Sequence, residues 1–158
     1  MATRPINISL LGDKLLQRKL KRLDVAVQKR IVKYALTRAG RIVLNTVRET
    51  APVGDPENPN LRERRVGVGL LQAYMTQRSV RARNKKGFFG VFIRPGTREQ
   101  LGITADDPFF YPAALIYGHG RVAPNPFLYD ALETNKDICK AEIASQIGAG
   151  IAREAGKV

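Results

Sequence analysis

The sequence predicts an α+β fold, in which a small, mainly antiparallel sheet with a β-hairpin packs against a long N-terminal helix and a C-terminal helix. Three observations predict it: an apolar stripe of helical period over residues 24–50, two alternating segments around a polar turn at 84–87, and a second helical stripe that begins near residue 125. Because 158 residues is near the usual size of one domain, we expect a single domain over 1–158.

The long helix is the clearest expected element. Asp24 is a good N-cap residue, and Ala51-Pro52 ends the helical pattern after Thr50. A shorter basic helix over about 13–22 precedes it, and weak alternation over 6–11 predicts a short strand. The apolar stripe consists of Val25, Val32, Ala35, Leu36, Ala39, Val43 and Val47. A separate, mostly basic face carries Arg30, Lys33, Thr37, Arg41, Asn45 and Arg48.

The hairpin is predicted from two alternating segments, 74–83 and 88–94, around the turn at 84–87. A single helical turn over 69–73 is expected just before it. Alternation sorts the first strand into two faces. These faces are Thr76, Arg78, Val80 and Ala82 on one side and Met75, Gln77, Ser79 and Arg81 on the other.

Long loops are expected at about 52–68 and 96–109, where proline, glycine, asparagine and charged residues gather. Residues 111–117 fit either an edge strand or a helical turn, because Pro112 interrupts the pattern. Asn125 as N-cap and Pro126 in the first turn predict one last helix, whose final turns Gly148 and Gly150 weaken. Its apolar stripe is Phe127, Leu128, Ala131, Leu132, Ile138, Cys139, Ile143 and Ile147.

Charge narrows the class of partner. Lys and Arg number 27 against 14 Asp and Glu, which gives a formal net charge of +13. Such a surface attracts nucleic acid, anionic membranes or acidic proteins. No apolar run approaches the roughly 20 residues that span a bilayer, so we expect no membrane partner. The absence of a signal-peptide pattern at the N-terminus favours the cytoplasm as the place of synthesis.

The residues that could carry chemistry favour structural interpretations. His119 lies between two glycines, and the single cysteine, Cys139, lies on the apolar stripe of the last helix, which predicts a buried structural thiol. The acidic pairs Asp106-Asp107 and Asp55-Glu57 lie in segments of loop composition. No phosphate-loop or dinucleotide pattern is present. We therefore expect no enzyme, no catalytic residues, no cofactor and no metal site.

The last third of the chain carries an arrangement of short motifs. Phe110-Tyr111 leads to Tyr117-Gly118-His119-Gly120 and then to Pro126-Phe127-Leu128 at the start of an amphipathic helix. With the long basic helix and the hairpin, this resembles the tail-completion, or head–tail joining (neck), proteins of long-tailed bacteriophages. The chain departs from that pattern at Ile116, where such proteins often carry an acidic residue, and in a longer loop over 98–107.

This resemblance implies a structural virion protein that joins the phage tail to the head connector. It implies a homo-oligomer, a hexameric ring around the DNA channel, located at the head–tail junction and assembled in the host bacterial cytoplasm. Its partners would be the head connector, tail-tube or tail-terminator proteins, and double-stranded DNA contacted without sequence specificity. Subunit or partner contacts are expected at Arg62, Arg64, Arg65, Arg83, Lys85 and Lys86. Lining of the DNA channel is expected at Arg30, Lys33, Arg41 and Arg48.

Two alternatives stay open. Basic residues interleaved with aromatic ones on a hairpin also suit a stand-alone nucleic-acid-binding protein, whose monomer would bind with an affinity that falls steeply as salt rises. A small nuclease that uses Asp106, Asp107 and His119 is the alternative from the enzyme class.

Overall fold

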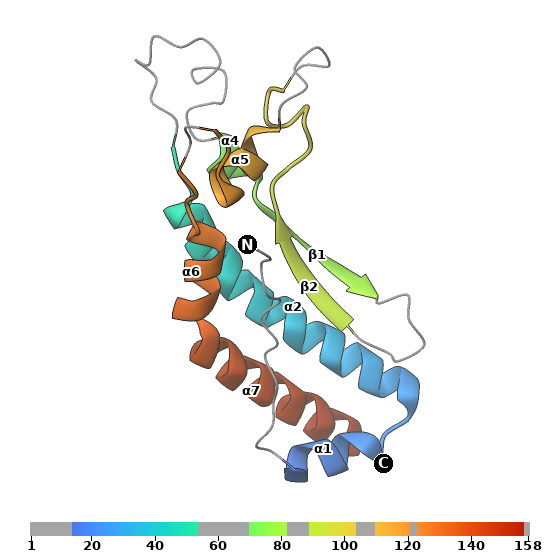
Figure 1. Ribbon diagram of the computed structural model, residues 1–158. Helices are drawn as coiled ribbons and strands as arrows, with labels where there is room; N and C mark the ends of the chain where they lie inside the picture. The colour runs from blue at the N-terminus through green and yellow to red at the C-terminus, as the bar shows by residue number, and fades with distance from the viewer. Residues whose placement is uncertain (1–13, 54–69, 82–88, 104–109, 121–122, 157–158) are drawn as a thin grey trace. The chain divides into compact units, whose positions relative to one another are not determined.

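The computed structural model describes residues 14–53, 70–81, 89–103, 110–120 and 123–156, and it confirms the α+β class (Figure 1). The two strands form an antiparallel hairpin. The predicted strand at 6–11 and the turn at 84–87 lie outside the described residues. The elements are α1 (Lys14–Lys21), α2 (Val25–Thr50), α4 (Leu70–Tyr74), β1 (Thr76–Arg81), β2 (Phe89–Arg94), α5 (Tyr111–Tyr117), α6 (Phe127–Thr134) and α7 (Lys136–Ala155).

The contacts within the chain divide it into two compact units. The first unit holds α1, α2 as far as Ala39, the ends of the strands next to the hairpin turn, and α7. The second unit runs from Gly40 to Arg78 and from Val91 to Asn135. Both units share α2 and the hairpin, and the expectation of one domain stays a prediction.

Helix α2 begins and ends where the sequence predicts. The amide of Ala26 donates to Asp24 Oδ1 at 2.7 Å, which satisfies one of the backbone donors that a helix leaves without partners at its start. At the other end, Ala51 donates to Val47 O at 2.8 Å and is itself buried. Asp24 is therefore confirmed as the N-cap.

The buried stripe of α2 differs in part from the predicted one. The sequence predicts Val25 on this stripe, but its side chain is 59% exposed, so that prediction is wrong. It lies eighteen residues, or five full turns, before the buried Val43, so periodicity places it on the buried side. Its exposure reflects its position as the first residue of α2. Val32 and Leu36 are half-buried. The buried positions are Ile31, Ala35, Ala39, Val43, Leu44 and Val47.

In the first unit, α7 runs antiparallel to the first part of α2 (Figure 1). The Cys139 thiol donates to Ala39 O at 3.5 Å, and near the other end a Cβ added to Gly150 would lie 2.8 Å from Ile31 Cγ2. This is tighter than a side chain tolerates, so Gly150 permits the close approach of the two helices. Gly150, which the sequence predicts to weaken the final turns of the helix, therefore also has a role in packing.

The last helical segment is two helices rather than one. Asn135 lies between α6 and α7 and is buried, and its Nδ2 donates to Ala131 O at 2.8 Å and to Thr46 Oγ1 at 2.9 Å. The N-cap of α6 is Pro126 rather than Asn125, and no side chain caps the helix. The backbone N–H of Asn125 donates to Leu115 O at 2.7 Å. Ile138 was placed on the apolar stripe and is 56% exposed.

In the second unit, the hairpin lies against α2 at Gly40. A Cβ added to Gly40 would lie 2.7 Å from Val91 Cγ1 and 2.9 Å from Gln77 Oε1, so a glycine is required for the sheet to pack this closely. Arg48 fixes the entry to β1, because its Nε and Nη2 donate to Met75 O at 3.2 and 2.9 Å.

Residues 96–103 are more ordered than the predicted polar loop. The amide of Leu101 donates to Thr97 O at 3.1 Å and that of Ile103 to Arg98 O at 2.8 Å, forming consecutive turns. Leu101 is fully buried, so the segment adds an apolar side chain to the core. Residues 111–117, for which the sequence allowed a strand or a helical turn, form helix α5. None of the described helices is long and apolar enough to cross a membrane.

Candidate partner-binding surfaces

The register of the hairpin decides which side chains share a face. Among the described residues the two strands pair with one another, and each has six residues. From their equal lengths and antiparallel direction we infer a register that sets Arg78 opposite Phe92 and Thr76 opposite Arg94. The same register continues beyond the strands, since the Cβ position of Gly96 lies 2.8 Å from Tyr74 Cβ.

One face of the hairpin packs inward and the other faces outward. Gln77 and Val91 point toward Gly40 of α2, so the alternate positions point away from that helix. On this outward face Phe92 is 58% exposed, and Arg78 and Arg94 are exposed. We call Arg78, Phe92 and Arg94 the sheet patch.

The sheet patch combines charge with an exposed aromatic ring. Neither Arg78 nor Arg94 forms an ion pair with any residue in the described part of the chain. Opposed residues of an antiparallel pair have Cβ atoms about 5 Å apart, so the Arg78 side chain borders the Phe92 ring. Arginine and aromatic residues are the side chains that most often dominate protein–protein contacts. The sequence pointed to Arg78 as basic but missed Phe92 and Arg94, because only the contact with Gly40 shows which face is outward.

The basic face of α2 is exposed as predicted, but two of its four arginines and lysines are used within the chain. In the first unit, Arg30 Nη2 pairs with Glu154 Oε1 at 2.7 Å, while Lys33 is exposed. In the second unit, Arg41 is exposed, whereas Arg48 donates to the backbone of Met75. Lining of a DNA channel by these residues stays a prediction.

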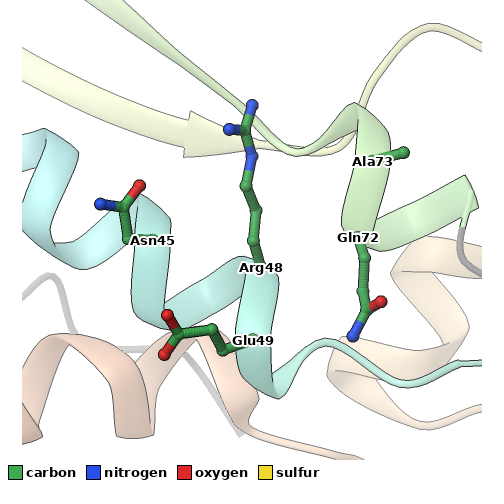
Figure 2. A pocket seen from close by; sticks show the side chains of 5 residues that line it. All are labelled: Asn45, Arg48, Glu49, Gln72 and Ala73. Atoms are coloured by element: carbon green, nitrogen blue, oxygen red, sulfur yellow. The ribbon is translucent and has the colours of Figure 1, made fainter.

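A shallow hollow of about 560 Å³ lies beside Arg48 (Figure 2). Four of its five lining residues are polar, and they come from the end of α2 and from α4, but most of the lining surface is apolar. Figure 2 shows Arg48 extending toward the segment that enters β1, and Gln72 Nε2 donates to Ala51 O at 3.2 Å. Two of the polar side chains that line the hollow, Arg48 and Gln72, therefore already bond the backbone. The lining residues are Asn45, Arg48, Glu49, Gln72 and Ala73.

The motif residues that carry the resemblance form the connection from α5 to α6. Gly118 and Gly120 have φ of 77° and 58°, a backbone region that favours glycine, and the Gly118 amide donates to Ala114 O at 2.8 Å. Phe127 is 3% exposed and Leu128 is half-buried, so both side chains are turned toward the interior at the start of α6. Tyr117 is 66% exposed.

The residues weighed for chemistry do not converge in the described part. Cys139 is buried, and burial, followed by the nearby Glu142 carboxylate, raises the pKa of its thiol and disfavours the nucleophilic thiolate. His119 is exposed at the α5–α6 connection. Asp106 and Asp107 lie outside the described residues. Among the residues that the structure does describe, no group of three or more His, Cys, Asp or Glu could hold a metal ion.

Six further predicted contact residues also lie outside the described ranges. They are Arg62, Arg64, Arg65, Arg83, Lys85 and Lys86. Comparison of the chain with models of protein families, with curated proteins and with solved structures finds no match.

Proposed function

We propose that this protein is a structural subunit of a bacteriophage virion that joins the tail to the head connector. In this role copies of the chain form a ring, with six as the expected number, around the channel through which DNA passes. Its neighbours are connector proteins on one side and tail-tube or tail-terminator proteins on the other. The proposal rests on the sequence resemblance and on the surface chemistry of the second unit.

The observation that supports it best is the sheet patch. A ring that encloses DNA needs side chains that hold protein neighbours as well as cations that face phosphate. A half-exposed phenylalanine between two arginines has little to offer a duplex backbone, which presents charge but no apolar surface, yet it suits burial against another protein. Phe92 therefore favours assembly over a surface that serves duplex DNA alone.

The exposed cations of α2 suit the second requirement. Lys33 and Arg41 are solvent-exposed, and neither forms an ion pair with another described residue. Exposed lysine and arginine attract phosphates without reading base sequence. We assign these two side chains to the DNA channel, and Arg30 and Arg48 to contacts within the chain.

The experiment is the mass of the purified protein by light scattering, measured across a salt series with and without duplex DNA. We expect a discrete closed oligomer, or a monomer that does not bind DNA at physiological salt. A monomer that binds free duplex tightly, with an affinity that falls steeply with salt, would contradict the proposal and support the stand-alone nucleic-acid-binding protein.

A further inference from the structure

We propose that the sheet patch docks onto an exposed, acidic face of helix α6 in a second copy of this chain. The inference rests on the proposed function, since it names the contact between neighbouring subunits of the ring. The face of α6 consists of Tyr129, Asp130 and Glu133, and we call it the helix patch.

The helix patch is the outer side of α6. Phe127 and Ala131 turn one side of this helix inward, at 3% and 2% exposure, whereas Tyr129 is 49% exposed. At 100° per residue, Tyr129, Glu133 and Asp130 fall within an arc of about 100° on the opposite side. Asp130 and Glu133 are both exposed. The patch thus places two carboxylates next to one exposed aromatic ring.

The two patches complement each other in charge and in composition. The sheet patch offers two guanidinium groups beside a phenyl ring, and the helix patch offers two carboxylates beside a phenol ring. Arginine and carboxylate groups form strong paired hydrogen bonds, and aromatic rings bury well against one another at the centre of a contact.

The patches lie on different sides of α2 within the second unit. Gly40 faces the sheet, and Thr46 accepts the hydrogen bond from Asn135 at the end of α6. These two positions are six residues apart, which is about 120° around the helix axis. One copy therefore cannot place its sheet patch against its own helix patch. It can use both patches at once with two different neighbours, which is the head-to-tail contact that closes rings.

Salt should affect this contact differently from DNA binding. Each copy carries a net charge of +13, so copies repel at low ionic strength. At about 0.15 M salt the Debye length is roughly 8 Å, which screens repulsion between whole molecules but leaves paired groups in contact largely attracted. We expect association to strengthen from about 0.01 M to about 0.15 M salt and to weaken again near 1 M.

Charge reversal on each patch tests the contact. The sheet variant is Arg78→Glu with Arg94→Glu, and the helix variant is Asp130→Arg with Glu133→Arg. The matched control is Arg22→Glu with Lys29→Glu, which makes the same change in charge as the sheet variant on exposed residues outside both patches and outside the proposed channel lining. We expect each patch variant to weaken self-association at least ~30-fold, and the control to leave it within about threefold.

Mixing the two patch variants distinguishes a head-to-tail contact from a general loss of folding or of charge balance. Each patch variant alone should be monomeric, because it retains only one working patch. Their mixture should assemble again with the two variants alternating, since the acidic patches of the sheet variant meet the basic patches of the helix variant at every contact. A chain that carries all four reversals should associate again, because the charges are swapped on both sides.

Cross-linking covers the case in which a charge reversal unfolds α6. Cys139 is the single cysteine and is buried, so the background of disulfide-linked chains is low. Arg94→Cys and Asp130→Cys chains, mixed and oxidised, should form a disulfide between the two variants more readily than either forms with itself. Equal yields in all three samples would overturn the contact.

The remaining outcomes are equally decisive. A ring that survives in both patch variants overturns this contact but leaves the proposed function standing. A wild-type chain that stays monomeric at high concentration and gives no selective cross-link also overturns it. If the sheet variant assembles normally and loses binding to single-stranded DNA, the patch is a nucleic-acid surface instead. A monomer that binds duplex DNA tightly overturns the contact and the proposed function together.

Discussion

Where α7 crosses α2, apolar side chains are covered and charged ones find partners. Ile31, Ile143 and Ile147 are each at most 6% exposed, and Arg30 and Arg38 pair with Glu154 and Glu142. On the outward face of the hairpin, Phe92 is 58% exposed and the neighbouring arginines have no ion partner among the described residues. Both regions contain aromatic or aliphatic residues beside arginines, but only the first is complete within one chain. The second is the kind of surface that a neighbouring protein completes.

The variant with the largest expected effect on stability disrupts the contact between α2 and α7. Replacing Ile143, which is 6% exposed, by alanine leaves a cavity in the helix contact, and we expect it to lower the free energy of unfolding by about 3 kcal/mol. Ile138→Ala on the same helix is the control, because Ile138 is 56% exposed, and it should change stability by less than about 0.5 kcal/mol. Urea denaturation of the two variants measures both. Similar losses of stability in Ile143→Ala and Ile138→Ala would show that Ile143 is not buried in the contact between α2 and α7.

A second test concerns a buried hydroxyl in α5, which belongs to neither of the two regions compared. Tyr111 is 5% exposed, its hydroxyl has no partner among the described residues, and burial raises its pKa to about 12. The folded state therefore holds this proton above pH 10, where the unfolded chain releases it. The stability tied to the neutral hydroxyl is full below pH 10 and is lost as pH rises toward 12.

Tyr111→Phe removes this dependence. Between pH 9 and pH 11.5 we expect the wild type to lose about 2 kcal/mol more stability than the phenylalanine variant, from guanidinium unfolding at each pH. The variant also corrects for lysine titration, which is common to both chains. At pH 7 it should be as stable as the wild type or slightly more so, because it no longer buries an unpaired hydroxyl. Parallel pH profiles would contradict the assignment.

Two glycines of α7 compare a tightly packed position with a more open one on the same helix. A methyl group at position 150 would meet Ile31 Cγ2 at 2.8 Å, whereas at position 148 the nearest atom is Leu16 Cδ1 at 4.0 Å. We expect Gly150→Ala to destabilise the protein by about 1 kcal/mol, since overpacking outweighs the gain in helix propensity. Gly148→Ala should stabilise it by about 0.5 kcal/mol. Thermal unfolding of both variants measures these changes in stability. In a double-mutant cycle, Ile31→Ala should reduce the stability loss caused by Gly150→Ala.

The smallest expected effect on stability is at the open region. Phe92→Ala should change the free energy of unfolding by less than about 1 kcal/mol, because the ring is already largely in water. It should nevertheless weaken self-association about tenfold or more, measured by sedimentation. Loss of folding together with association would assign Phe92 to the core, which would remove the contrast between the two regions.

Two of the four basic residues predicted to line the channel make contacts within the chain. Lys33 and Arg41 are exposed and form no ion pair with another residue in the described ranges, whereas Arg30 and Arg48 bond to other parts of the chain. Sequence spacing cannot make this distinction, because the partners of Arg30 and Arg48 lie 124 and 27 residues away. The same holds for Phe92, whose exposure depends on which face of the hairpin meets Gly40.

The sequence by itself determined the elements whose causes are local. The Asp24 cap, the length of α2, the two alternating strands and the burial of Cys139 and Phe127 follow from side-chain periodicity and from residues a few positions away. Tertiary structure decided what depends on distant partners. Asn135 lies where the last helical segment divides, and its side-chain amide donates to Thr46. Gly150 leaves room for the side chain of Ile31. The hairpin packs with Val91 facing inward and Phe92 facing outward. Periodicity describes how a segment repeats, but only packing between segments fixes which side of it meets the core.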